Sequence, residues 1–135
     1  MIGKSLNERY TLGSLAADDA VARMKELLAT QGRPLVEVRA RDPRMVAFLV
    51  ARADEASVRF CRSLGFRLSR GKTGVFGLLG SDAARVFGEL PEHQRSWLET
   101  PCGPRETKVV LVAGGGRALL SIDAREGQVA IAAFE

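Results

Sequence analysis

Residues 67–87, RLSRGKTGVFGLLGSDAARVF, come closest to a chemical site by residue type and spacing. Gly71-Lys72-Thr73 matches the end of the nucleotide-phosphate motif Gly-x-x-x-x-Gly-Lys-Ser/Thr, in which backbone N–H groups and the lysine hold a phosphate. The full motif needs a glycine at position 66, where the chain has Phe66. The phosphate motif also joins a strand to a helix, whereas here the residues that follow Thr73, GVFGLLG, are typical of a strand. The sequence therefore predicts a tight turn here and not a phosphate cradle.

Residues suited to catalysis or metal binding are isolated along the chain. His93 is the only histidine, and Cys102 follows it at a spacing that fits no thiol–histidine motif. We interpret both as loop residues. The acidic pairs Asp18-Asp19 and Asp54-Glu55 are adjacent in predicted helices, where neighbouring side chains diverge. The sequence thus predicts no catalytic set, no metal site and no cofactor, and it favours a protein that is not an enzyme.

Basic residues are concentrated in one part of the chain. The whole chain has a net charge of +4, whereas residues 33–72 contain ten basic and four acidic residues, a local charge of +6. In a helix starting at position 42, with 100° of rotation per residue, four arginines fall within an arc of about 80°: Arg44, Arg52, Arg59 and Arg62. The candidate nucleic-acid or anion-binding residues are Arg44, Arg52, Arg59, Arg62, Arg67, Arg70 and Lys72. The alternative is a solvated face whose arginine stems cover apolar surface and complement the helix dipole.

Apolar periodicity predicts the elements that position these residues. A first helix is expected at 14–30. A second runs from the Asp42-Pro43 N-cap to position 64, and Gly65 ends it. A third begins at Ser81-Asp82, breaks at Pro91 and continues through EHQRSWLET. Strands are expected in PLVEVRA (34–40), FRLSR, VFGLL, KVVLVA, RALLSI and QVAIAAF, with PCGPRE as a loop and turns at 114–116 and 123–127.

The order of elements in residues 34–113 is strand, helix, strand, strand, helix, strand. This order predicts an α+β fold with a ferredoxin-like (βαββαβ) plait core. Right-handed crossovers would place both helices on one face and the first and third strands in the middle of the sheet. The helix 14–30 is then an addition, and a C-terminal β-hairpin, 117–134, extends the sheet beyond the fourth strand. Another strand order remains open.

Length and composition predict a single domain over residues 1–135, because 135 residues leave no room for a second core of ordinary size. The two cysteines stand 41 positions apart, as expected of reduced cytoplasmic thiols. The first residues, MIGKSLNERYTL, carry charges where a signal peptide needs an apolar run, and no stretch approaches the roughly 20 apolar residues of a membrane span. We therefore expect a soluble, cytoplasmic protein without a membrane partner.

Two segments resemble known families. RGKTGVFGLL resembles the coenzyme-A pyrophosphate loop of the GNAT N-acetyltransferases, and RFCRSLGF resembles a helix and Gly-Phe ending of that family, although the two occur in the reverse order and Thr73 replaces a glycine. KTGVFGLLGSDAARVF resembles the third strand and following helix of RNA-recognition-motif domains. Phe76 falls at one stacking position of that family, whereas Gly74 replaces a second aromatic.

Three functions follow as hypotheses. The first is a small non-catalytic module whose basic surface binds nucleic acid, in particular RNA, or an acidic protein partner. The second is a structural or regulatory interaction subunit of a homo- or hetero-oligomer, in which the apolar VAIAAF segment is an edge strand for association. The third, which follows from the acetyltransferase resemblance alone, is a small acyltransferase-like enzyme.

Overall fold

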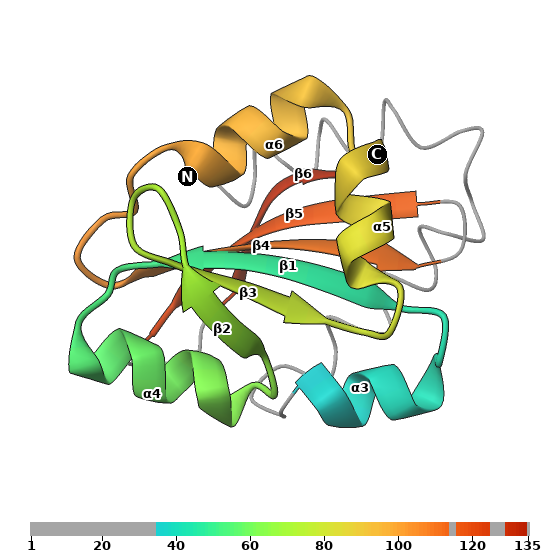
Figure 1. Ribbon diagram of the computed structural model, residues 1–135, viewed down its shortest axis with the longest axis horizontal. Helices are drawn as coiled ribbons and strands as arrows, with labels where there is room; N and C mark the ends of the chain where they lie inside the picture. The colour runs from blue at the N-terminus through green and yellow to red at the C-terminus, as the bar shows by residue number, and fades with distance from the viewer. Residues whose placement is uncertain (1–34, 114–115, 125–128, 135) are drawn as a thin grey trace.

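The computed structural model describes residues 35–113, 116–124 and 129–134, and these form one antiparallel sheet with helices on both faces (Figure 1). The sheet order is β2-β3-β1-β4-β5-β6. The strands are Val46–Ala51 (β1), Arg67–Arg70 (β2), Val75–Leu79 (β3), Glu106–Ala113 (β4), Gly116–Asp123 (β5) and Val129–Phe134 (β6). The described helices are Leu35–Arg41 (α3), Glu55–Ser63 (α4), Ala83–Glu89 (α5) and Glu92–Glu99 (α6).

β1 is the centre of the structure, because all six of its residues, VAFLVA, are buried. Side chains alternate along a strand. Ala47, Leu49 and Ala51 therefore pack into the core that contains Cys61 and Leu64, at the end of α4. Val46, Phe48 and Val50 pack into a second core formed with Ala83, Leu90 and Leu98 of the α5–α6 region. Figure 1 shows the same arrangement, with α3 and α4 below the sheet and α5 and α6 above it.

The sequence prediction for residues 34–64 is largely wrong. The predicted strand 34–40 is the helix α3, in which Val38 is buried and Val36 is exposed. The predicted long helix from position 42 is a turn, the strand β1 and then the shorter helix α4. Asp42 does not cap that helix; its carboxylate accepts a hydrogen bond from the backbone N–H of Arg44 at 3.2 Å.

The physical reason is the unbroken apolar run 46–51. A helix presents one apolar stripe, whereas a strand buried on both faces accepts apolar residues at every position. β1 pairs with β3 on one side and with β4 on the other. Neither edge of β1 is therefore free to pair with residues 34–40, which lie outside the sheet. The last part of the predicted helix does form, as α4, and Gly65 follows its end in a left-handed conformation with φ of 93°, as expected.

The fold is α+β with an open antiparallel sheet, as predicted, but the specific ferredoxin-like plait is not confirmed. The C-terminal hairpin does extend the sheet, because β5 pairs with β4 and β6 with β5. However, α4 and the α5–α6 pair cover opposite faces, whereas the plait prediction placed both helices on one face. β1 and most of β4 are apolar on both faces, so each face needs its own cover. The predicted helix 14–30 lies outside the described residues.

The second half of the chain agrees with the predicted elements. β2 and β3 are joined by a short turn, and α5 and α6 are separated at Pro91, which cannot continue a helix. The segment PCGPR is a loop before β4. Both cysteines are free, and Cys61 is buried. None of the helices in the described part of the chain is long and apolar enough to cross a membrane.

Candidate functional site

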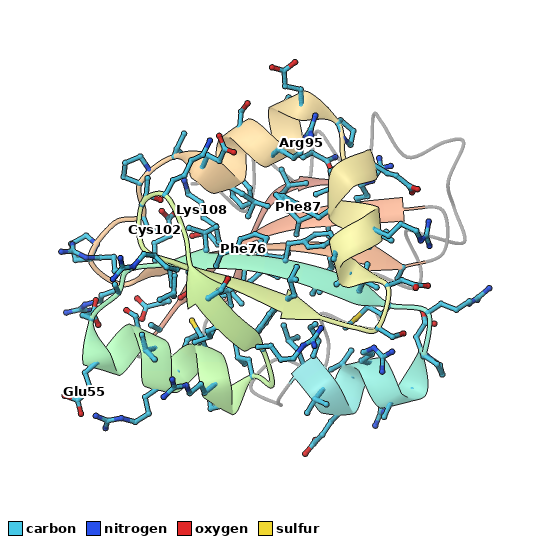
Figure 2. The ribbon with its side chains drawn as sticks, viewed as in Figure 1. Glu55, Phe76, Phe87, Arg95, Cys102 and Lys108 are labelled. Carbon is cyan, nitrogen blue, oxygen red and sulfur yellow. The ribbon has the colours of Figure 1, made fainter. Side chains whose placement is uncertain are left out.

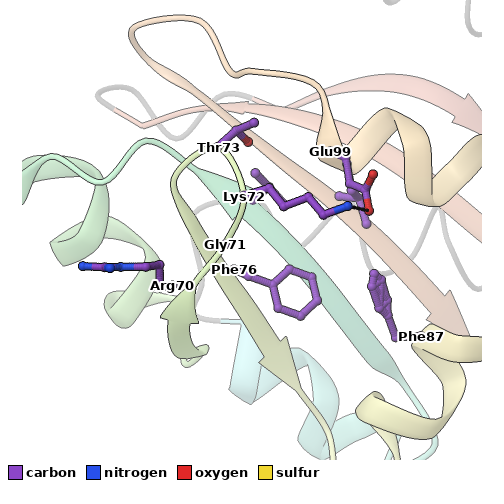
Figure 3. Close-up of a pocket in the computed structure, with 9 residues that line it drawn as sticks. Arg70, Gly71, Lys72, Thr73, Phe76, Phe87 and Glu99 are labelled. Carbon is purple, nitrogen blue, oxygen red and sulfur yellow. Dashed lines mark hydrogen bonds and ion pairs between the residues drawn. The ribbon is translucent and has the colours of Figure 1, made fainter.

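A pocket of about 250 Å³ lies between the β2–β3 turn and the end of α6, above the last residues of β1 (Figure 3). Four apolar side chains form its walls: Val50, Phe76, Phe87 and Leu98. Its mouth is formed by residues 70–73 of the turn region and by Glu99. β1, the β2–β3 hairpin, α5 and α6 therefore meet around one cavity.

The aromatic walls are fixed by packing against each other. The rings of Phe76, on β3, and Phe87, on α5, stack with centroids 4.9 Å apart, and Phe48 supports Phe87 from behind at 5.3 Å. Figure 2 shows the Phe76 and Phe87 side chains between the sheet and the upper helices. Such offset aromatic contacts favour one arrangement of the rings. The apolar part of the pocket is thus preformed.

The turn Gly71–Gly74 closes one side of the pocket. The backbone N–H of Gly71 donates to the carbonyl oxygen of Gly74 at 2.8 Å, so the turn prediction is confirmed. Gly74 approaches the end of β1 so closely that an added Cβ would lie 2.0 Å from the carbonyl oxygen of Ala51. Only glycine fits at this approach, which holds the turn against the strand. The absence of phosphate binding at this turn stays a prediction.

An ion pair spans the mouth of the pocket. Lys72 Nζ lies 3.4 Å from Glu99 Oε1, and the two side chains are 77% and 50% exposed. Figure 3 shows Lys72 extending from the turn toward Glu99 above the two phenylalanine rings, while Arg70 points away from the pocket. The cavity therefore has an apolar floor and an entrance with one positive and one negative group.

Lys108 fixes the end of α6 beside this pocket (Figure 2). Its buried ammonium donates to the carbonyl oxygens of Trp97 at 3.2 Å and Thr100 at 3.1 Å, and to the Thr100 hydroxyl. It also lies 5.4 Å from the centroid of the Trp97 ring, which is within cation–π range. These carbonyls are the ones that a helix end leaves without intrahelical partners, so Lys108 holds α6 and Glu99 in position.

Cys102 lies next to this anchor but has no features of a nucleophile. Its Sγ donates to the carbonyl oxygen of Val50 at 3.3 Å. Burial raises the pKa of the Cys102 thiol, against the lowering influence of Lys108. His93 lies in the first turn of α6, a helix of eight residues and about 12 Å, whereas Cys102 lies three residues beyond the other end of this helix. His93 is in this helix and not in a loop.

The predicted basic surface is divided by the fold. Arg44 and Arg52 flank β1, so about 20 Å of strand separates them, and the predicted single helical arc does not exist. Only Arg59 and Arg62 lie on α4. On β2, Arg67 pairs across from Leu78 and Arg70 from Val75, whose side chains belong to opposite cores, so these two arginines face opposite sides of the sheet.

Most of these basic groups also have acidic neighbours. Ion pairs join Arg44 to Asp42 at 3.8 Å, Arg52 to Asp54 at 3.9 Å, Arg59 to Glu55 at 2.9 Å and Lys72 to Glu99. The remaining three arginines, Arg62, Arg67 and Arg70, are exposed and form no ion pair within the described residues. The structure thus leaves a smaller and more scattered basic set than the sequence predicts.

The structure also places the predicted stacking residue Phe76 and the acidic pair Asp54-Glu55. Phe76 does not lie on an open stacking surface for bases, because α5 and α6 cover its face of the sheet and its ring packs on Phe87. Asp54 and Glu55 bind within the chain, to Ser57 and Arg59. Among the residues that the structure describes, no group of three His, Cys, Asp or Glu side chains is placed to hold a metal ion.

Sequence reasoning missed five residues of the pocket: Val50, Phe76 as a wall residue, Phe87, Leu98 and Glu99. Each belongs to an ordinary apolar or charged pattern, and only the folded chain shows that they face one cavity. The one available signal was Gly74, a glycine beside a strand end that permits close backbone approach. No family model, curated protein or solved structure matches this chain.

Proposed function

We propose that this protein is a non-catalytic binding module whose ligand is a small molecule with an apolar body, held in the pocket under the Gly71–Gly74 turn. The observation that carries the proposal is the combination of a cavity of about 250 Å³, four apolar walls and a charged entrance. Concave apolar pockets with a few polar groups at their edge are the usual form of small-molecule sites.

The chemistry of the lining favours binding over catalysis. The polar side chains around the cavity are Arg70, Lys72, Thr73 and Glu99, without a histidine or cysteine. General acid–base or nucleophilic catalysis needs a reactive group and a partner within hydrogen-bond reach. Glu99 is engaged by Lys72 at the mouth, above the apolar floor. The site therefore supports recognition of a ligand without a chemical step.

Isothermal titration calorimetry with the neutral alcohol 3-methylbutanol tests this proposal. We expect saturable binding to one site with a negative heat-capacity change, since an apolar body leaves water. The variant Val50→Phe fills the cavity and should abolish binding. Val58→Phe makes the same substitution on α4, across the sheet from the pocket, and should retain it. If Val50→Phe does not fold, Leu98→Phe fills the same space from α6.

Absence of binding by the wild-type protein would overturn the proposal. Unchanged binding by a folded pocket-filling variant would do so as well, because the ligand would then occupy another place.

A second candidate is binding of nucleic acid, which the three exposed arginines without ion pairs favour. If Arg62, Arg67 and Arg70 contact phosphates, the logarithm of the affinity falls with the logarithm of salt by about 0.7 to 0.9 per contact. Fluorescence anisotropy with a labelled RNA oligonucleotide measures this slope. Replacing all three arginines by glutamate should make this salt slope shallower. The same replacement of the paired set Arg44, Arg52 and Arg59 is the matched control and should leave the slope unchanged. No binding by the wild type at low salt would exclude this candidate.

Neither the interaction-subunit nor the acyltransferase hypothesis is favoured by a contact among the described residues.

A further inference from the structure

We propose that the ligand of this pocket is a zwitterion, specifically a free α-amino acid with an apolar side chain. The proposal rests on the binding function proposed above and names the ligand class. The apolar side chain would enter between Val50, Leu98 and the phenylalanine pair. The α-carboxylate would meet Lys72 and the α-ammonium would meet Glu99.

The size of the cavity limits the ligand. A volume of about 250 Å³ equals the space of about eight water molecules at roughly 30 Å³ each. Pockets for drug-sized ligands begin at about 300 Å³, so this one suits a smaller body. A branched aliphatic or thioether side chain with its polar end at the mouth fits that limit.

The charges at the entrance determine the polar end. Lys72 and Glu99 come from opposite sides of the mouth, one from the turn and one from the end of α6. A ligand with only a carboxylate would meet Lys72 but would also lie against the negative Glu99. A ligand with only an ammonium group would pair with Glu99 but would also lie against the positive Lys72. A ligand that carries both charges on one carbon pairs each with its opposite.

The existing ion pair does not block this exchange. Both side chains are at least half exposed and their atoms are 3.4 Å apart, so the pair is a solvated surface contact of small net worth. Separating the pair to admit a zwitterion replaces one contact with two. Arg70 points away from the cavity and Lys108 is held by the carbonyls at the end of α6, so neither supplies the entrance charge.

A matched ligand series tests the assignment by calorimetry. L-Leucine carries both charges, whereas 3-methylbutylamine keeps the ammonium, 4-methylpentanoate keeps the carboxylate and 3-methylbutanol has no charge. We expect leucine to bind about tenfold more tightly than each of the other three, as a charge-assisted contact allows. Lys72→Met should remove the advantage over the amine, and Glu99→Gln the advantage over the carboxylate. Arg59→Gln, at an exposed cation on α4 across the sheet from the pocket, should leave all affinities unchanged.

The outcomes separate this inference from the binding function. If 3-methylbutanol binds and leucine binds no more tightly, the zwitterion assignment is wrong while the apolar pocket remains a binding site. If none of the four compounds binds, both are wrong. If leucine binds more tightly but Lys72→Met and Glu99→Gln leave its advantage intact, the charges at this mouth do not recognise it and the assignment fails.

Discussion

Asp54 and Asp82 occupy the same N-cap position of their helices, but only Asp54 makes the capping contact. Its carboxylate accepts hydrogen bonds from the Ser57 backbone N–H at 2.9 Å and the Ser57 hydroxyl at 3.1 Å, whereas the Asp82 side chain caps no backbone group. A capping side chain satisfies an amide that the first helical turn leaves unpaired. Asp54→Ala should therefore lower the melting temperature by a few degrees, and Asp82→Ala by less. Equal losses would mean that the contact does not stabilise α4.

The same contact predicts a pH dependence. The hydrogen bonds from Ser57 lower the pKa of Asp54 below the ordinary value of an aspartate side chain. A carboxyl whose pKa is depressed in the folded state stabilises the protein above its unfolded pKa, and this stabilisation is lost as the pH falls through the folded value. The difference in melting temperature between the wild type and Asp54→Ala should thus shrink below about pH 4. A difference that stays constant down to pH 2 would contradict this.

Cys61 predicts a second pH dependence, at the alkaline end. Burial raises the pKa of this thiol from 9.0 to about 11. The unfolded chain then ionises first, so the contribution of Cys61 to stability is complete below pH 9 and is lost between pH 9 and 11. The loss approaches about 3 kcal/mol for two pKa units. Urea unfolding in a Cys102→Ala background should show this fall, and adding Cys61→Ala should remove it. The same slope in both proteins would contradict the assignment.

At the scale of elements, two glycine-to-alanine substitutions should have opposite effects. An added Cβ at Gly74 would meet the Ala51 carbonyl at 2.0 Å, whereas at Gly88, within α5, it would meet open space. Gly74→Ala should destabilise the protein by about 1–3 kcal/mol, as overpacking does. Gly88→Ala should stabilise it by about 0.5–1 kcal/mol, because alanine loses less backbone entropy in a helix. Urea unfolding measures both, and a neutral Gly74→Ala would show that the turn does not lie against β1.

Element prediction from sequence succeeded where local signals and burial agree. Pro91 interrupts the helical pattern between α5 and α6, and Gly65 ends α4, so both boundaries are set by the backbone chemistry of one residue. It failed at residues 46–51, whose apolar residues fit a helical stripe in part and a doubly buried strand completely. Which of the two forms is decided by β3 and β4, which pair with this segment from distant parts of the chain. No local pattern contains that information.

At the scale of the molecule, the sheet should be most stable at its centre. β1 has hydrogen-bonded neighbours on both sides and is buried at every residue, whereas β2 has four mostly exposed residues and pairs with β3 alone among the described strands. Amide exchange follows local stability. In hydrogen–deuterium exchange, we expect the amides of β1 and β4 to exchange slowest and those of β2 fastest among the strands. Uniform exchange across the sheet would contradict this order.

The candidate site shows what sequence cannot supply at this scale. The seven predicted basic residues lie close in sequence, yet β1 separates Arg44 from Arg52 and the pleat of β2 separates Arg67 from Arg70. The pocket is the reverse case, since Val50, Phe87 and Leu98 are distant in sequence and meet only when α5 and α6 cover one face of the sheet. A site made by long-range packing leaves no compact motif.

The most direct test of the central claim is the location of binding, measured by ¹H–¹⁵N correlation spectra during titration with 3-methylbutanol. We expect saturable shifts concentrated at Val50, at the turn Gly71–Gly74 and its neighbour Phe76, and at the end of α6 around Leu98 and Glu99. These residues surround the cavity from three separate elements. Saturable shifts confined to another part of the sheet, or no saturable shifts at all, would contradict the claim that this pocket is the binding site.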